Sequence, residues 1–256
     1  MSETLCEEVL LAEAPDIDHL ITEDDTPVDN IFSEKQQRLL VEPLYLSWHP
    51  EQPFVAVANL GIFHSVHEPP IVPDMFLSLN VQVAEDLWAK QHRAYFLWEF
   101  GKPPEVVVEI VSNKRGGEID KKLRTYTRIG VWYYLIFDPQ CLIQEEQLRI
   151  YEIMLGRHRV KSDRDLKPID LSVTLWEGEF EGSRNLWLRW CDAQGNLIPT
   201  GVEQSLAERQ RAEQEYQRAE QERQYAERER RRAERLAAQL RALGVEPTNG
   251  GNGEGA

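Results

Sequence analysis

An acidic residue inside a strongly apolar stretch most constrains how this chain can fold. Residues 105–111, EVVVEIV, are almost all β-branched and apolar, a pattern typical of a strand covered on both faces. Glu109 stands within this stretch. A carboxylate that is buried without a partner is strongly destabilising or takes up a proton. The fold must therefore bring a cation close to Glu109.

A predicted helix after this strand offers that cation. Residues 118–129 place apolar side chains at the spacing of one helix face. These side chains are Ile119, Leu123 and Tyr126. Lys122 falls on the same inward face, so the helix directs one ammonium group toward the sheet. Lys122 is therefore the candidate partner of Glu109.

A second strand completes the unit. Gly130 ends the predicted helix, and residues 131–137, VWYYLIF, form another apolar run. A strand, a helix and a strand in succession favour two adjacent parallel strands joined by a right-handed crossover. This geometry places Glu109 and Lys122 near one end of the sheet.

Asp74 is a second acid embedded in apolar sequence. Residues 71–79, IVPDMFLSL, predict a strand, and Pro73 suits a strand edge or a bulge. Two carboxylates and a lysine in apolar surroundings are typical of a metal-dependent site that cleaves phosphodiester bonds. An ordinary buried ion pair between Glu109 and Lys122, with Asp74 capping a turn, explains the same residues equally well.

Ordered motifs between residues 20 and 155 carry a family resemblance. They are Pro73-Asp74, Glu109-Ile110-Val111-Ser112, Lys122 followed by Tyr126, Gly130-Val131, Tyr133-Tyr134 and Asp138-Pro139. With these motifs the chain resembles the Uma-two family of restriction endonucleases, within the PD-(D/E)xK nuclease superfamily. The resemblance implies an α/β fold, with a restriction-endonuclease-like mixed sheet flanked by helices.

The resemblance also implies a metal-dependent endonuclease that acts on DNA. Asp74 and Glu109 would bind Mg²⁺ or Mn²⁺ together with the backbone carbonyl of Val111, and Lys122 would join the two acids in catalysis. The superfamily lysine would fall at Val111, and Lys122 takes its place, as in the family generally. Family members often carry Asp at the position of Glu118, so the role of Glu118 is open. The alternative is a catalytically inactive nuclease fold that serves as a nucleic-acid-binding or coiled-coil scaffold module.

The charge of the chain opposes DNA binding. The formal net charge is −15, whereas nucleic-acid-binding proteins usually present a basic surface. Phosphate would therefore approach through a divalent metal, a local basic patch or both. Lys114, Arg115, Lys121 and Arg124 form the candidate patch. A solvated helix face explains these four residues equally well.

Cysteine usage and hydropathy indicate a cytoplasmic protein. The three cysteines, Cys6, Cys141 and Cys191, show no CxxC spacing, which argues against a disulfide framework or a zinc site. No apolar run approaches the roughly 20 residues of a membrane span. The acidic N-terminus differs from the basic start of a signal peptide.

Three further segments complete the predicted domain. Residues 30–48 predict a helix with an inward face of Ile31, Leu39, Leu40 and Leu44, and Pro43 kinks or ends it. Glu34 or Glu42 of this helix could supply another acid to the site, although a glutamate exposed on a helix surface is far commoner. Residues 83–100 carry Trp88, Tyr95, Phe96 and Trp98, which either cover the sheet or stack on bases. The role of Glu99 in this segment is open.

The remaining strands follow the second parallel strand. Residues 147–153 alternate like an antiparallel edge strand, and residues 157–165 are polar. Residues 169–175 and 185–190 predict a closing hairpin, followed by a tight turn at 192–196.

The composition changes after residue 200. Residues 203–243 predict a long helix with a seven-residue repeat, in which Ala212, Ala219, Ala226, Ala233 and Leu240 share one position. A solvated single helix and self-association are both open, as is a homodimer through the nuclease domain. The predicted organisation is an acidic irregular segment (1–28), a nuclease domain (29–200), the heptad helix (203–243) and a flexible tail (244–256).

Overall fold

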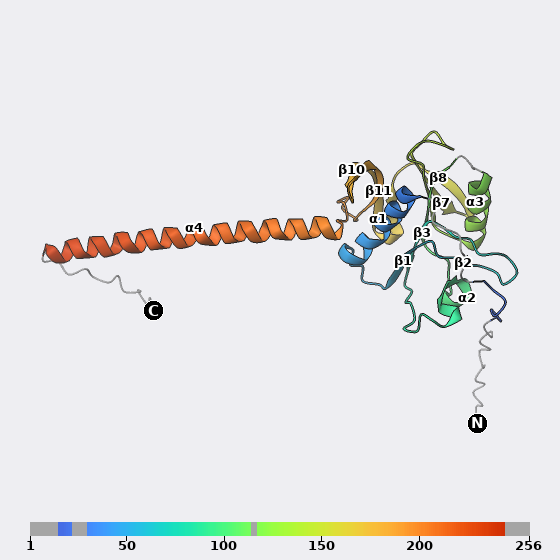
Figure 1. Ribbon diagram of the computed structural model, residues 1–256, viewed down its shortest axis with the longest axis horizontal. Coiled ribbons are helices and arrows are strands. Elements are labelled where there is room, and N and C mark those ends of the chain that lie inside the picture. Colours follow the sequence, from blue (N-terminus) through green and yellow to red (C-terminus); the bar gives the residue numbers. More distant parts are fainter. Residues whose placement is uncertain (1–14, 22–29, 114–116, 244–256) are drawn as a thin grey trace, which may run out of the picture. The chain divides into compact units, whose positions relative to one another are not determined.

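The computed structural model describes residues 15–21, 30–113 and 117–243 of the chain (Figure 1). It divides into two compact units after Gly201. The predicted irregular segment lies mostly outside the described residues, and so do Lys114, Arg115 and the predicted tail. The fold is mixed α/β, with a six-stranded sheet, an N-terminal helix and a long C-terminal helix.

The central sheet has the strand order β1-β3-β5-β6-β7-β8. Its strands are β1 (Phe54–Ala58), β3 (Met75–Leu79), β5 (Val106–Ile110), β6 (Tyr133–Phe137), β7 (Leu148–Met154) and β8 (Arg157–Lys161). Only β5 and β6 are parallel within this sheet, and the other neighbours are antiparallel. Helix α3 (Gly117–Ile129) connects the two parallel strands, which confirms the predicted strand–helix–strand unit.

Two layers cover the opposite faces of this sheet (Figure 1). On one face lie α1 (Ile31–Ser47) and a second sheet, in the order β11-β10-β9. That sheet contains β9 (Asp165–Leu166), the short helix η2 (Lys167–Ile169), then β10 (Leu171–Phe180) and β11 (Ser183–Cys191). On the other face lie α3 and the parallel pair β2 (Ile62–Phe63) and β4 (Tyr95–Phe96), flanked by η1 (Lys90–His92) and α2 (Leu97–Phe100).

The strand that contains Glu109 is buried along its whole length, as its composition predicts. All five residues of β5 are buried, and so are the five residues of β6. Alternate side chains of a strand point to opposite faces. Val106, Val108 and Ile110 therefore pack toward α1, whereas Val107 and Val111 pack toward α3.

Helix α1 follows the predicted range but differs in its buried face. Leu39, Leu40 and Leu44 are buried, whereas Ile31 is 76 % exposed, so its assignment to the inward face is wrong. Ile31 and Leu40 are nine residues apart, or about two and a half turns, and therefore lie on opposite sides of the helix. Pro43 lies inside α1 and does not end it.

Strand β7 is not the edge of the sheet, contrary to the sequence-based prediction. The polar residues 157–161 form β8, which pairs with β7 and makes the edge. A tight turn joins the two strands, with positive φ angles at Leu155 and Gly156. The polar composition of β8 is that of an edge strand, which has only one neighbour and greater exposure to solvent.

The predicted closing hairpin is present and longer than expected. Strands β10 and β11 pair in antiparallel register from Ser172 opposite Cys191 to Phe180 opposite Ser183. The tight turn that follows is also present, because the amide of Gly195 donates to the carbonyl oxygen of Asp192 at 3.0 Å. The hairpin packs its buried face against α1 and thereby closes that side of the core.

Helix α4 (Gly201–Ala242), which the structure describes throughout, forms the second unit from Val202 onward. No residue of α4 is buried. Its side chains pair along the helix, with Arg218 and Arg230 each contacting the glutamate four residues later at 3.2 and 3.0 Å. Such exposed pairs contribute about 0.3–0.5 kcal/mol each, so the repeat supports a helix locally. Pairing of α4 with a second copy stays a prediction.

Replacement of Gln36 by Ala should lower the free energy of unfolding by about 2–4 kcal/mol. The buried Gln36 side chain donates to the carbonyl oxygen of Leu188 at 2.8 Å and accepts from its amide at 2.9 Å. The substitution leaves both backbone groups of β11 buried without a partner, at about 1–3 kcal/mol each. Urea denaturation measures the loss. Arg38→Ala is the matched control on the same helix, since Arg38 makes only exposed ion pairs and its loss should cost less than about 1 kcal/mol.

Candidate active site

Asp74 and Glu109 lie next to each other at one end of the six-stranded sheet. In the antiparallel register Met75 is opposite Val108, so Asp74, the residue before β3, falls opposite Glu109. On the other side of Asp74, the amide of Asn59 donates to the Asp74 carbonyl oxygen at 3.3 Å. The pairing of three neighbouring strands therefore brings two carboxylates together, although they are 35 residues apart in the sequence.

Helix α3 supplies two partners to the Glu109 carboxylate. The Lys122 ammonium group donates to Oε2 at 2.8 Å, and the Tyr126 hydroxyl donates to Oε1 at 2.9 Å. Lys122 and Tyr126 are four residues apart and lie on one face of the helix. The Glu109 side chain is 8 % exposed and that of Lys122 is 19 % exposed, so the pair is shielded from bulk water but can be reached from the surface.

The environment of Glu109 favours its protonated form. The pKa of Glu109 is raised to about 7, because burial and, less strongly, the Asp74 carboxylate together outweigh the lowering effect of Lys122 and the Tyr126 hydroxyl. One ammonium group thus compensates only part of the cost of burial. Burial and the adjacent Glu109 also hold the pKa of Tyr126 well above its usual range, so its hydroxyl keeps the proton that it donates.

The Asp74 carboxylate is held by hydrogen bonds from β5 and α1, whereas that of Glu109 is held from α3. Its Oδ2 accepts from the amide of Ile110 at 2.6 Å, and its Oδ1 accepts from the Gln37 side chain at 3.1 Å. Gln37 also exchanges two hydrogen bonds with the Asn59 side chain, at 3.1 and 2.8 Å. The first helix therefore reaches the site through an amide that orients Asp74.

Sequence reasoning missed Gln37 and considered Glu34 or Glu42 of the same helix, with an exposed position as the commoner alternative. Glu34 instead pairs with Arg38 at 3.0 Å on the helix surface, and Glu42 is exposed. The signal for Gln37 was its position three and seven residues before Leu40 and Leu44, which places an amide on the buried face of α1. A polar side chain at a core position requires polar partners, and here those partners are at the site.

The loop before β3 is fastened to the site by Lys122. The same ammonium group donates to the carbonyl oxygen of Val72 at 3.0 Å, two residues before Asp74. Val111, the predicted backbone ligand, directly follows β5, and its amide donates to the carbonyl oxygen of Phe137 at 2.8 Å. Lys122 thereby links α3, the end of β5 and the segment that leads into Asp74.

The other residues considered in the sequence lie away from this group. Glu99 is exposed on α2, and the side chain of Glu118 lies outside the described residues. The aromatic segment leaves β3 at Leu79, the end opposite Asp74. Tyr95 and Phe96 of this segment are buried, whereas Trp88 is 81 % exposed.

The donor atoms of this site fit a hard divalent cation. Mg²⁺ binds oxygen ligands, retains several water molecules and needs only one or two protein carboxylates. Within the described part of the chain, no cluster of three or more His, Cys, Asp or Glu side chains is arranged as a metal site. Asp74 and Glu109 supply the one or two carboxylates that a Mg²⁺ ion needs from the protein. Burial and Asp74 raise the pKa of Glu109 despite its contact with Lys122, and a bound cation would favour its carboxylate form.

The mixed sheet, with acids and a lysine at one end, is typical of restriction-endonuclease-like folds. Residues 22–167 match the model of the Uma2 family, described as "Putative restriction endonuclease". The match spans more than half of the chain, so the chain belongs to this family. No curated protein matches the chain.

A solved structure with a similar chain is described as a "putative nuclease belonging to DUF820" from Anabaena variabilis ATCC 29413. The two chains are 18 % identical, and the alignment covers 54 % of this chain and 72 % of the other, with a TM-score of 0.39. At this level the likeness has no bearing on activity. Among the helices that the structure describes, none has the length and apolar character needed to cross a membrane.

Glu109→Gln should remove a pH dependence from the stability of the protein. A carboxyl group whose pKa is raised by folding binds more protons when folded, so its contribution to stability is lost as the pH rises. The window runs from its ordinary pKa of 4.5 to about 7. Relative to Glu109→Gln, the wild-type free energy of unfolding should fall by up to about 3 kcal/mol across this window. Urea denaturation at intervals from pH 4.5 to 8 measures the difference, and a constant difference would contradict the assignment.

Proposed function

We propose that this protein is a metal-dependent endonuclease that hydrolyses phosphodiester bonds in DNA. The observation that supports the proposal is the Lys122–Glu109 contact next to Asp74 at the end of the sheet. Membership of the Uma2 family supplies the reaction class and DNA as the substrate. The acid–lysine group supplies the chemistry that such a reaction requires.

Asp74 and Glu109 would hold Mg²⁺ or Mn²⁺, with the backbone carbonyl of Val111 as a further ligand suggested by the family resemblance. Such an ion, when bound, supplies Lewis acidity to the phosphate and to the attacking water. Each carboxylate oxygen of the two acids accepts a hydrogen bond described above. These contacts orient both carboxylates, and carboxylate oxygens are the protein ligands that such an ion prefers.

Lys122 contributes a positive charge where negative charge develops on the phosphate. Its ammonium group donates to Glu109 and to the Val72 carbonyl oxygen. A small rotation of the side chain would aim a donor at a phosphate oxygen or at the attacking water. Because both contacts hold the ammonium group in place beforehand, little reorganisation is needed during the reaction.

Tyr126, Gln37 and the Ile110 amide act as positioning groups. Tyr126 holds one oxygen of Glu109, while Gln37 and the Ile110 amide each hold one oxygen of Asp74. They come from α3, α1 and β5, so the site is supported from both faces of the sheet. Such support keeps two like charges close together in the geometry that a metal ion requires.

The experiment is plasmid nicking with Mg²⁺ or Mn²⁺. The wild-type protein should convert supercoiled plasmid to nicked and linear forms, and EDTA should abolish this. Asp74→Asn, Glu109→Gln and Lys122→Met should each lower the rate about 10²–10³-fold, because each removes charge from the group that stabilises the transition state. These substitutions preserve side-chain size, and circular dichroism checks that the variants fold.

Glu99→Ala is the matched control, since Glu99 is an exposed acid on α2 and its loss should leave the rate unchanged. Equal nicking by the wild type and all three site variants would show that the activity comes from elsewhere. No nicking by the wild type with either metal would favour the inactive nuclease fold that serves as a binding or scaffold module.

A further inference from the structure

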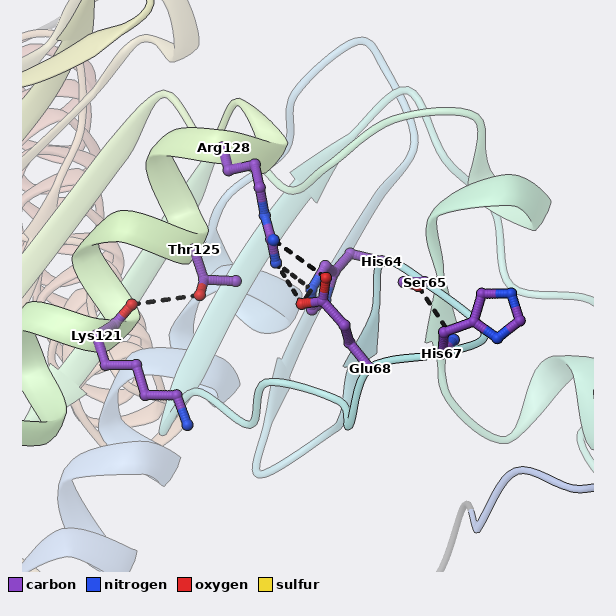
Figure 2. Close-up of polar contacts among 7 residues, drawn as sticks. All are labelled: His64, Ser65, His67, Glu68, Lys121, Thr125 and Arg128. Carbon is purple, nitrogen blue, oxygen red and sulfur yellow. Dashed lines mark hydrogen bonds and ion pairs between the residues drawn. The ribbon is translucent and has the colours of Figure 1, made fainter.

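A recess on the outer side of α3 gathers several cations beside the candidate active site. Lys121, Arg124, Thr125 and Arg128 line it from the helix, and Glu68 lines it from the loop before β3, with Asp120 completing the wall. The four helix residues have the spacing i, i+3, i+4 and i+7 of a single helix stripe. Figure 2 shows Arg128 extending from this stripe toward Glu68 and His64.

Arg128 and Glu68 form the fixed wall of the recess. Nη1 and Nη2 of Arg128 donate to the two oxygens of Glu68 at 3.1 and 2.5 Å, and Nη2 also contacts Nε2 of His64 at 2.8 Å (Figure 2). Arg128 and His64 hold the pKa of Glu68 below its usual range, so Glu68 is ionised at neutral pH. The charges of Arg128 and Glu68 therefore offset each other, and the pair ties the loop to the helix.

Lys121 and Arg124 supply the positive charge that this pair does not offset. Both side chains are exposed, and neither forms an ion pair with another residue that the structure describes. Asp120 is the one further acid in the lining, so the recess has an excess of positive charge. The chain as a whole carries a net charge of −15.

The recess and the candidate active site share helix α3 and the loop before β3. Lys122 follows Lys121 on α3 and contacts both Glu109 and the Val72 carbonyl oxygen. Val72 and Glu68 belong to the same loop, four residues apart. A polyanion bound in the recess would therefore contact the same helix and loop that hold Lys122.

We propose that Lys121 and Arg124 bind the phosphate backbone of duplex DNA next to the bond that is cleaved. This inference rests on the proposed function, since duplex DNA is the substrate assigned to the site. Lysine and arginine side chains that neutralise phosphates give an affinity that falls with salt, with a slope of about 0.9 per contact. Lys121 and Arg124 therefore give this acidic chain a defined site at which DNA phosphates bind.

The test is fluorescence anisotropy of a labelled duplex of about 20 base pairs, with the full-length protein in EDTA over a series of salt concentrations. Lys121→Ala/Arg124→Ala should weaken binding at least tenfold at low salt. It should also reduce the slope of log affinity against log salt by about 2, because two phosphate contacts are lost. Lys167→Ala/Arg184→Ala is the matched control, since it removes one lysine and one arginine that are exposed on the second sheet.

Unchanged affinity in the first double variant would overturn the proposal, as would an equal loss in the control or no binding by the wild type. Plasmid nicking with Mg²⁺ by the same proteins separates this proposal from the nuclease assignment. If Lys121→Ala/Arg124→Ala nicks plasmid at the wild-type rate, the DNA-binding role of these two residues is overturned and the nuclease assignment stands. If Lys121→Ala/Arg124→Ala loses binding, the control does not, and the wild-type protein fails to nick plasmid, the DNA-binding role of these residues is supported and the nuclease assignment is overturned.

Discussion

The burial of Glu109 in a central strand is the constraint on which the rest of the structure depends. A carboxylate in that position must receive hydrogen bonds and positive charge, and both come from α3 through Lys122 and Tyr126. The helix can supply them only if it crosses over the sheet between two parallel strands. The interaction therefore links the choice of topology to the construction of the site, because the same two side chains dock α3 and orient Glu109.

Asp74 turns this ion pair into a group that carries an excess of negative charge. Two carboxylates lie beside one ammonium group, and the Asp74 carboxylate raises the pKa of Glu109. Gln37 and the Ile110 amide hold Asp74 in place despite the repulsion. An ordinary buried ion pair needs no second acid, so the added carboxylate favours a metal-binding role over a structural one. This is the physical reason for preferring the nuclease proposal.

Electrostatics on two scales govern how such a site could meet DNA. The chain as a whole repels a polyanion, since its net charge is −15. In the recess on α3 the balance reverses, because its three cationic side chains outnumber its two acids. The long helix α4 pairs its own charges along its surface and so differs from this local cationic arrangement.

The sequence by itself determined the elements whose cause is local. The β-branched run around Glu109, the inward position of Lys122 and the heptad repeat after residue 200 are all readable from periodicity, because side-chain spacing follows helix and strand geometry. Only the tertiary structure decided that Gln37 rather than a glutamate reaches Asp74, that Ile31 faces solvent, and that β8 rather than β7 forms the edge. Those outcomes depend on which distant segments pack together, and no local pattern contains that information.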